Sequence, residues 1–399
     1  MLKPDASLSD VYTHETYLQG RGVPVSWFSF PEDGKIVRGY SALLNDMEVD
    51  LLAEQVHVEY VEEDATVFAS SEQYQYQYQY PLDNNVDTMK SQRGAPWGLE
   101  RISHRSLSEH DHDHMYHYLP KDGEHVTVYV VDTGIYVQHE EFQGRASWGV
   151  TTASEDDENV DGNGHGTHCA GTIAGKTYGV CKHCKVVAVK VLSRNGSGSM
   201  SDVIRGIEYV IDDHRKRAEK ATEGKPGNSA KSVANLSLGG SYTRTLNRAV
   251  NAASKAGIHF VVAAGNEHQD ACNTSPASAE SAISVGATDS GDAMTYFSNY
   301  GKCTTLYAPG YEIESAWIGS PRAKLTISGT SMAAPHVAGT VGALLSRDST
   351  RVTNSDDLKS LLVEMATHDA ISGIPRGSGG VNALLYTGVV KKKLSKDTM

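Results

Sequence analysis

Residues 125–134, HVTVYVVDTG, decide the fold. The stretch is apolar at consecutive positions and rich in Val, which is typical of a parallel strand buried on both faces. The apolar run stops at Asp132, and Thr133 and Gly134 follow it. In open α/β sheets the active site lies beyond the carboxyl ends of the strands. The stretch therefore predicts a central strand that places Asp132 at the functional edge of a sheet.

Short apolar runs followed by helical patterns recur down the chain. The later apolar runs are VVAVKVL (186–192), SVANLSL (232–238), HFVVAAG (259–265) and AISVGAT (282–288). The helical patterns are HGTHCAGTIAG (165–175), SMSDVIRGIEYVIDDHRK (199–216), RTLNRAVNAASKAG (244–257) and TSMAAPHVAGTVGALLS (330–346). Strands joined in this way form a parallel sheet with helices on both faces. The sequence thus predicts an α/β fold, a three-layer sandwich around a mostly parallel central sheet.

Length and charge limit the classes of function. The chain has 399 residues, enough for two domains, and its formal net charge is −13 at pH 7. Nucleic acid is a poor partner for an acidic chain, because phosphates require a basic surface. The apolar runs are too short to span a bilayer, so no membrane partner is expected. The first residues, MLKPDASLSDVYTHE (1–15), do not read as a secretory signal.

The chain before the first buried strand has a different pattern. Residues 1–70 are expected to form a small α+β domain, with strands at 34–44 and 57–64 and a helix at 44–55. Residues 71–93 have the composition of a linker and contain QYQYQYQY at 73–80. Alternating Gln and Tyr is also compatible with a strand or an aggregating patch. The position of the tract between two complete units favours a spacer.

Polar residues stand at other predicted strand ends and helix starts. His165 and Ser331 each open a helix, and Asn266 ends an apolar run. A serine hydroxyl becomes a good nucleophile when a histidine accepts its proton, and a buried carboxylate orients that histidine. A helix N-terminus supplies N–H donors and positive potential to an oxyanion. We therefore expect Asp132, His165 and Ser331 to act together in hydrolysis, with Asn266 as a further oxyanion donor.

Each of these motifs has a simpler interpretation when it is taken by itself. DTG can be a turn after a strand, GTS can be a helix cap, and HGTH can be a metal-binding pair. The metal pair lacks the glutamate of HExxH, and the sequence has no GxSxG elbow to support an α/β-hydrolase site. The order Asp, His, Ser at successive element ends favours a hydrolytic triad.

Four blocks resemble the signature blocks of the subtilisin-like serine proteases. They are VVDTGI (130–135), NGHGTHCAG (163–171), AAGN (263–266) and SGTSMAAPHVAG (328–339). Together with APWGLERIS (95–103), they make the chain most similar to the fungal proteinase K and cerevisin branch. The resemblance implies a serine endopeptidase domain over residues 94–388, with Asp132, His165 and Ser331 as the triad. It also implies that the side chain of Asn266 completes the oxyanion hole.

The resemblance further implies how a protein or peptide substrate is held. The expected substrate-binding residues are Gly196, Ser197, Gly198, Ser237, Leu238, Gly239, Ala264 and Gly265. In the family the first two triplets are edge strands that pair with an extended substrate, so recognition is largely independent of sequence. The pocket segments carry no acidic residue, which predicts a broad preference for aromatic or large aliphatic residues before the cut. The alternative is that Gly196 and Gly198 form only a flexible turn.

The blocks GYSALLND (39–46) and VEYVEEDATV (58–67) resemble the inhibitory propeptide of these proteases. The resemblance implies an autoprocessed zymogen whose propeptide, residues 1–70, blocks its own active site. By analogy, the cut is expected close to Met89, with the mature enzyme starting near Lys90 and the Gln/Tyr tract discarded. The short N-terminus suggests a truncated gene model of a secreted enzyme, with the vacuole as the alternative location. A monomer with a basic tail at 389–399 is expected.

Five cysteines are present. Cys181 and Cys184 form a lone CxxC, for which a local disulfide or plain packing is favoured over a zinc site. Cys272 and Cys303 lie where some members of the family have a disulfide, which would place the protein in an oxidising compartment. Cys169 is expected to pack beneath His165.

No cofactor or metal site is expected. Family members often hold structural calcium, but Thr305 and Ala370 stand where carboxylate ligands would be needed. The run HDHDHMYH (110–117) could bind zinc or nickel, although a solvated loop is favoured. Two rival functions remain open on the sequence, an inactive binding protein and a permanently inhibited scaffold.

Overall fold

The computed structural model describes residues 1–73, 89–107, 114–156, 158–224, 230–347 and 354–389. Three sequence predictions therefore lie wholly or mostly outside the described residues. They are the Gln/Tyr tract beyond Gln73, the His/Asp run at 110–113 and the basic tail after Val389.

The expected central sheet is present. Among the described residues, nine strands follow the order β19-β20-β16-β15-β13-β11-β7-β9-β8. Neighbouring strands from β8 through to β20 are parallel, and β19 is antiparallel to β20. The strands are β7 (Val126–Asp132), β8 (Ala146–Thr151), β9 (Lys185–Lys190), β11 (Lys231–Leu236), β13 (Ile258–Ala263), β15 (Ile283–Thr288), β16 (Leu306–Pro309), β19 (Thr367–His368) and β20 (Ala383–Leu384). The predicted strand β7 lies between β11 and β9, and every residue in it is buried.

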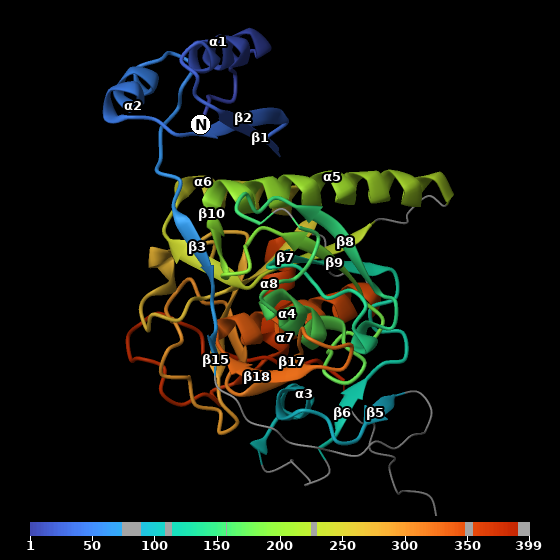
Figure 1. The fold of residues 1–399 in the computed structure, drawn as a ribbon. Helices are drawn as coiled ribbons and strands as arrows, with labels where there is room; N and C mark the ends of the chain where they lie inside the picture. Colours follow the sequence, from blue (N-terminus) through green and yellow to red (C-terminus); the bar gives the residue numbers. More distant parts are fainter. Residues whose placement is uncertain (74–88, 108–113, 157, 225–229, 348–353, 390–399) are drawn as a thin grey trace, which may run out of the picture.

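Helices cover both faces of this sheet, so the architecture has three layers (Figure 1). One outer layer contains α5 (Met200–Gly224) and α6 (Arg244–Lys255), and the other contains α4 (His165–Ala174), α7 (Thr330–Arg347) and α8 (Ser355–Met365). Side chains of β7 alternate between the two cores. Val128 and Val130 pack with α4 and α7, whereas Tyr129 and Val131 pack with α5 and α6. The fold class predicted from the sequence is confirmed. None of the helices in the described part of the chain is both long and apolar enough to cross a membrane.

The N-terminal domain contains two helices and a hairpin. These elements are α1 (Leu8–Gln19), β1 (Val25–Glu32), β2 (Lys35–Ala42) and α2 (Asp46–Ala53). The predicted strand at 34–44 and helix at 44–55 are present as β2 and α2. The strand predicted at 57–64 is wrong, because Val58 makes only an isolated bridge with Leu2. Acidic side chains at 57–64 contact helices α5 and α6.

The N-terminal domain rests on α5 and α6 (Figure 1). Phe28 and Phe30 of β1 join the apolar core that these two helices share with the sheet. Two carboxylates cap the helices. Glu62 accepts hydrogen bonds from the backbone N–H of Thr245 at 3.0 Å, and Asp64 accepts one from Ser201 at 2.9 Å. Unpaired N–H groups at helix N-termini favour such carboxylate partners.

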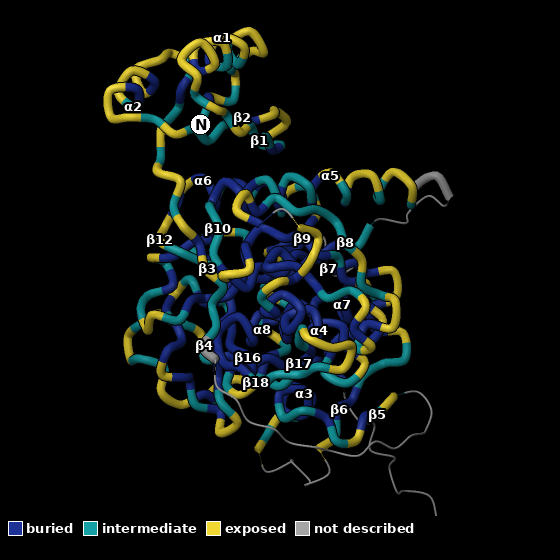
Figure 2. Tube along the Cα trace, in the orientation of Figure 1, coloured by how far each residue is buried: buried dark blue, intermediate teal, exposed yellow. Residues whose placement is uncertain are grey.

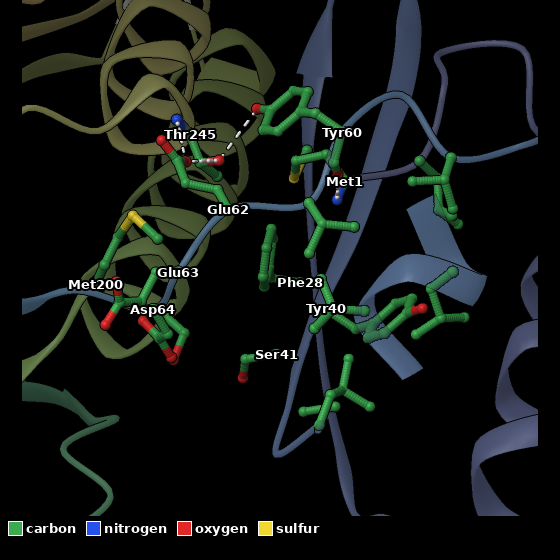
Figure 3. Close-up of a pocket in the computed structure, with 18 of the residues that line it drawn as sticks. Met1, Phe28, Tyr40, Ser41, Tyr60, Glu62, Glu63, Asp64, Met200 and Thr245 are labelled. Atoms are coloured by element: carbon green, nitrogen blue, oxygen red, sulfur yellow. Dashed lines mark hydrogen bonds between the residues drawn. The ribbon is translucent and has the colours of Figure 1, made fainter. Parts of the chain in front are cut away.

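A cavity of about 560 Å³ lies between the N-terminal domain and α5 (Figure 3). Its lining includes Phe28 and Tyr40 from the hairpin and Met200 from α5. Near its edge, the Tyr60 hydroxyl is hydrogen-bonded to Thr245 Oγ1 at 3.0 Å. None of the expected triad residues lines this cavity, so it is separate from the candidate active site.

Short strands and a short helix complete the structure around the body of the molecule. They are β3 (Thr66–Ala69), β4 (Glu72–Gln73), β5 (Lys90–Gln92), α3 (Trp97–Ile102), β6 (Tyr116–Tyr118), β10 (Ser197–Ser199), β12 (Leu238–Ser241), β14 (Thr274–Ser275), β17 (Ile313–Ala316) and β18 (Lys324–Ser328). Strand β3 runs from the N-terminal domain down along the body of the molecule (Figure 1). Figure 2 shows that the body beneath it is largely buried, whereas the N-terminal domain has much exposed surface.

Candidate active site

Asp132 is the last residue of β7 and has no exposed surface. Its two carboxylate oxygens lie 2.8 and 3.0 Å from Nδ1 of His165. The backbone N–H of Thr133 donates to the same carboxylate at 2.7 Å. A buried carboxylate requires such partners, because removal of a charge from water is costly. The central strand therefore presents a fixed acceptor to the imidazole, and it brings the predicted site residues Asp132 and His165 together.

His165 begins α4, directly after Gly164, whose φ is +105°. The side chain is almost fully buried. Burial by itself would lower the pKa of His165, but the adjacent Asp132 carboxylate raises that pKa well above its usual value. The pair favours the imidazolium form, and it fixes Nδ1 as the protonated nitrogen in the neutral form. The other nitrogen, Nε2, has no hydrogen-bond partner among the described residues.

Asp161 connects the loop after β7 to the start of α4, a role that the sequence reasoning did not anticipate. One of its oxygens accepts hydrogen bonds from Thr133 Oγ1 at 2.9 Å and from the backbone N–H of Gly164 at 2.8 Å. The other oxygen accepts from the backbone N–H and the hydroxyl of Thr167 at 3.0 and 2.6 Å. Asp161 thus ties the segment that carries Asp132 to the helix that carries His165. A carboxylate just before a helix start is a recognisable N-terminal signal that could have indicated this role.

Ser331 lies in the first turn of α7 and is buried. Its hydroxyl donates to the carbonyl oxygen of Ser237 at 2.8 Å. Cys169 Sγ lies 3.5 Å from the carbonyl oxygen of Ser331 and 4.0 Å from His165 Nδ1, so α4 and α7 meet at this thiol. The expected packing of Cys169 beneath His165 agrees with this position. Rotation of the Ser331 side chain away from Ser237 would free its hydroxyl for Nε2.

Asn266 follows β13 and is held by Thr330, the residue before Ser331. Its Oδ1 accepts from the Thr330 backbone N–H at 3.0 Å and from the Thr330 hydroxyl at 2.8 Å. Because a backbone N–H can only donate, these contacts fix the orientation of the amide. The Nδ2 group of Asn266 then remains as the donor end of the amide.

Strand β3 lies between β10 and β12, antiparallel to both. The expected edge strands are therefore brought together on either side of an extended peptide. Ser197 and Gly198 stand opposite Phe68 and Val67. Leu238 and Gly239 stand opposite Ala69 and Phe68. The carbonyl oxygen of Gly196 accepts from the Ala69 N–H at 2.9 Å, and that of Ser237 accepts from the Ser70 N–H at 3.3 Å. Gly196 and Gly198 therefore do more than form a turn, because Gly198 stands opposite Val67 and the Gly196 carbonyl is bonded to Ala69.

Ala264 and Gly265, which were predicted to border the first pocket, are packed against Asn299. Gly265 has a φ of +104°, and a Cβ there would lie 2.3 Å from Asn299 Nδ2. Asn299 donates to the Ala264 carbonyl at 2.9 Å and to the carboxylate of Glu267 at 2.7 Å. Asn299 and Glu267 were not predicted, and they are far from each other in sequence. Asn299 and Glu267 are recognised as part of the site only because they contact each other and the segment around Asn266.

Two disulfides are present among the described cysteines. Cys272 is bonded to Cys303, as the resemblance implied. Cys181 is bonded to Cys184, which removes these thiolates as zinc ligands. Cys169 is free and buried.

Thr305 and Ala370 stand at the two positions where calcium would need carboxylate ligands, and neither residue has one. Thr305 Oγ1 accepts a hydrogen bond from the Ser284 N–H at 3.2 Å, so a neutral hydroxyl occupies the first position. Among the described residues, one group brings three potential metal-ligand atoms within 4.8 Å of one another, and it consists of Asp132, His165 and Cys169. Their contacts serve the site already described, and the donor set of one carboxylate, one imidazole and one thiol does not fit calcium.

Comparison with known proteins gives consistent results. Residues 123–383 match the family model described as the subtilase family. The chain is 45% identical over 372 residues to the subtilisin-like serine protease Pen c 2 of Penicillium citrinum, covering 90% of this chain and 76% of that protein. It is also 45% identical over 367 residues to alkaline protease 2 of Aspergillus fumigatus, covering 90% and 70%. The crystal structure of a cold-adapted subtilisin-like serine proteinase is similar at 42% identity and a TM-score of 0.65, covering 74% of this chain and 99% of that one.

Proposed function

The chain belongs to the subtilase family and is a subtilisin-like serine endopeptidase, and from this premise we propose that Ser331, His165 and Asp132 perform its peptide hydrolysis. The observation that carries the assignment is the buried pair of His165 and Asp132. His165 Nε2 has no hydrogen-bond partner in the part of the chain that the structure describes, and the helix of His165 packs against the helix of Ser331. Substrates are proteins and peptides.

The reaction begins when the Ser331 hydroxyl turns from Ser237 toward His165 Nε2. Nε2 accepts the hydroxyl proton as Oγ attacks the carbonyl carbon, and Asp132 stabilises the imidazolium that forms. The resulting oxyanion receives hydrogen bonds from the Ser331 backbone N–H and the Asn266 amide. His165 then gives the proton to the leaving amine, which breaks the C–N bond and leaves an acyl-enzyme. Water hydrolyses this ester with His165 again acting as base.

We propose a broad specificity, with aromatic or large aliphatic residues preferred before the cut. The proposal is supported by the backbone pairing of β3 with β10 and β12, since such recognition is largely independent of side chains. The pocket segments at 237–239 and 264–265 carry no charged side chain. Digestion of a denatured protein mixture, followed by mass spectrometry of the new termini, tests this preference. Cleavage concentrated after Lys or Arg would contradict it.

We further propose that residues 1–70 act as an intramolecular inhibitor of a zymogen, and that the active form is a monomer exported from the cell. The contacts of β3 with β10 and β12 support the inhibitory role. The two disulfides support an oxidising compartment. The vacuole is the alternative location.

Covalent labelling separates the proposed function from its rivals. The wild-type protein should react with a fluorophosphonate probe at Ser331 and hydrolyse casein, whereas a Ser331→Ala variant should do neither. Full casein hydrolysis by Ser331→Ala would contradict the assignment. An unlabelled wild-type protein that keeps its intact N-terminus would favour the permanently inhibited scaffold.

A further inference from the structure

The chain's own segment 66–70 occupies the site as an extended peptide. Val67 is 1% exposed and belongs to the core shared by α5 and α6, whereas its neighbour Phe68 is 55% exposed. One side chain is therefore anchored while the next points to solvent, as in a strand held by its backbone. The carbonyl oxygen of Ala65 accepts from the Met200 N–H at 2.9 Å, so the pairing extends to the start of α5.

The carbonyl group of Ser70 lies at the expected oxyanion position. Its oxygen accepts a hydrogen bond from the Ser331 backbone N–H at 3.3 Å. A Cβ added to Gly329 would lie 2.3 Å from this oxygen and 3.0 Å from Ser71 Cα. The peptide bond between Ser70 and Ser71 thus passes directly over the turn that leads into α7.

The chain stays bound after this peptide bond. In β4, Glu72 stands opposite Ser328 and Gln73 opposite Ile327, both antiparallel in β18. The chain is thus paired on both sides of the Ser70–Ser71 bond, and the Ser70 carbonyl contacts the backbone N–H of Ser331, which is the arrangement of an intact substrate held in a reactive register.

The bond expected from the resemblance, between Met89 and Lys90, lies elsewhere. Lys90 begins β5, which pairs with β6 instead of β10 or β12. Gln92 is also fixed in place, because its Oε1 accepts from Lys182 Nζ at 2.6 Å and its amide donates to the Thr177 carbonyl at 2.8 Å. In this state Lys90 is paired with β6, so the Met89–Lys90 bond is held outside the pair of strands, β10 and β12, that flanks the bound segment.

We infer that the first self-cleavage of this chain occurs between Ser70 and Ser71, within the molecule. The inference rests on the proposed role of Ser331. Ser331 Oγ bonds to the Ser70 carbonyl carbon, the C–N bond to Ser71 breaks, and His165 transfers the serine proton to the new Ser71 amine. Water then releases a segment that ends in the Ser70 carboxylate. The protease is left with Ser71 as its N-terminus, so QYQYQYQY stays attached to the first product and its loss requires a second cut by another molecule.

The order of cuts can be measured on the full chain. Protein is refolded at serial dilutions, and the fragments are followed by intact mass spectrometry. The expected first products end at Ser70 and begin at Ser71, with a rate constant independent of concentration. Trimming toward Lys90 should follow, and it should slow as the protein is diluted. A first cut elsewhere, or a first cut whose rate constant rises with concentration, would overturn the inference.

Two matched proline variants add a position-specific test. Proline after a bond removes the N–H and fixes φ, so Ser71→Pro should slow the first cut by about 10²-fold or more. Lys90→Pro, at the first residue of a strand where proline is tolerated, should leave the first cut unchanged and block trimming at Met89. The reverse pattern would overturn the inference.

A labelling control separates failure of the inference from failure of the proposed function. A wild-type chain that reacts with a fluorophosphonate at Ser331 but is not cut after Ser70 overturns the inference alone. Processing that persists in refolded Ser331→Ala, free of other proteases, overturns the proposed nucleophile as well.

Discussion

At the scale of single residues, each proposed reacting group is held in its orientation by a specific hydrogen-bond partner. Asp132 sets the tautomer of His165, Thr330 sets the amide of Asn266, and Asp161 joins the two segments that carry Asp132 and His165. Each partner either accepts hydrogen bonds through its carboxylate or makes two hydrogen bonds to the same group. These bonds lie in a buried setting, where hydrogen bonds have their greatest effect on geometry.

Asp161→Asn should weaken both stability and turnover. The amide nitrogen cannot accept the hydrogen bonds that one carboxylate oxygen receives from Thr167, so two buried donors lose their partner. Loss of hydrogen bonds to a charged acceptor costs about 1.5–3 kcal/mol of unfolding free energy. Denaturant unfolding in the Ser331→Ala background measures this loss, and kcat of the otherwise native enzyme should fall too. Glu158→Gln, in the exposed part of the same loop, is the control and should change neither quantity.

Asn266→Ala should lower kcat and leave KM nearly unchanged, since the amide is proposed to bind the oxyanion and not the substrate. The expected loss is about 10²–10³-fold, a magnitude taken over from loss of the corresponding donor in subtilisin itself. Thr330→Val, which removes one of the two hydrogen bonds that orient the amide, should give a smaller loss. Equal effects on kcat and KM in Asn266→Ala would argue against an oxyanion role.

The pH dependence of kcat/KM should report the raised pKa of His165. The Asp132 carboxylate favours the imidazolium, so the basic form accumulates only as the pH rises through a pKa above the usual 6.5. The acid limb of the profile should therefore have its midpoint above pH 6.5. Asp132→Asn should move that midpoint down while lowering kcat by about 10⁴-fold, as expected for loss of the orienting carboxylate. An acid limb below pH 6 in the wild-type enzyme would contradict this account.

At the scale of elements, the local pattern of apolar residues predicts the strands and helices that are buried and have a regular apolar repeat. The parallel strands β7, β9, β11, β13 and β15 and the helices α4, α5, α6 and α7 follow from continuous apolar runs and the helical patterns after them, whereas β8 was not predicted. Helix α1 was missed because only His14 and Leu18 on it are buried, which leaves no apolar stripe to detect. Strand β3 was not predicted, because its strand-favouring run of Thr, Val and Phe is too short to be decisive and its pairing partners β10 and β12 lie more than a hundred residues away.

The same limit applies to the candidate site. Strand ends and helix starts indicated Asp132, His165, Asn266 and Ser331, since these positions are set by the local pattern. The sequence could not show that the Ser331 hydroxyl rests on Ser237, or that Asn299 contacts Glu267. Those contacts depend on side-chain rotation and on long-range packing, which periodicity does not encode.

Helix α7 contains a buried neutral histidine that should make the protein sensitive to acid. His336 Nδ1 donates to the Met332 carbonyl at 2.8 Å, and burial lowers the pKa of His336 to about 4. An unfolded chain takes up this proton near pH 6.5, before the folded one does. The stability that the neutral form contributes is thus complete above pH 6.5 and is lost as the pH falls toward 4, by about 3 kcal/mol.

Denaturant unfolding of Ser331→Ala between pH 7 and 4 measures this loss without autolysis. In a His336→Gln variant, unfolding free energy should be lower at pH 7 but fall less steeply with acid. An unchanged slope would show that His336 is not responsible. His268, an exposed residue, provides the control substitution to Gln, for which the slope should not change.

At the scale of the whole molecule, residues 1–70 are held in two separate ways. Strand β3 is held by backbone pairing in the site, and the domain before it is held on α5 and α6. The second attachment centres on Arg248 of α6, whose Nε donates to Glu32 at 2.8 Å and whose Nη1 donates to Glu59 at 2.7 Å. Cleavage after Ser70 would leave both attachments intact, so the cut alone does not release the segment.

Arg248→Ala should therefore speed release of the cleaved segment. The Arg248 side chain is only 13% exposed, and its removal leaves two partly buried carboxylates without their partner. A loss of about 1.5–3 kcal/mol corresponds to an off-rate higher by about 10- to 150-fold. The off-rate is measured by native mass spectrometry of the processed complex after dilution. Lys255→Ala removes the exposed pair with Asp33, 60% and 78% exposed, and should change the off-rate less than about 5-fold. Equal off-rates in the two variants would show that β3, and not the domain surface, controls release.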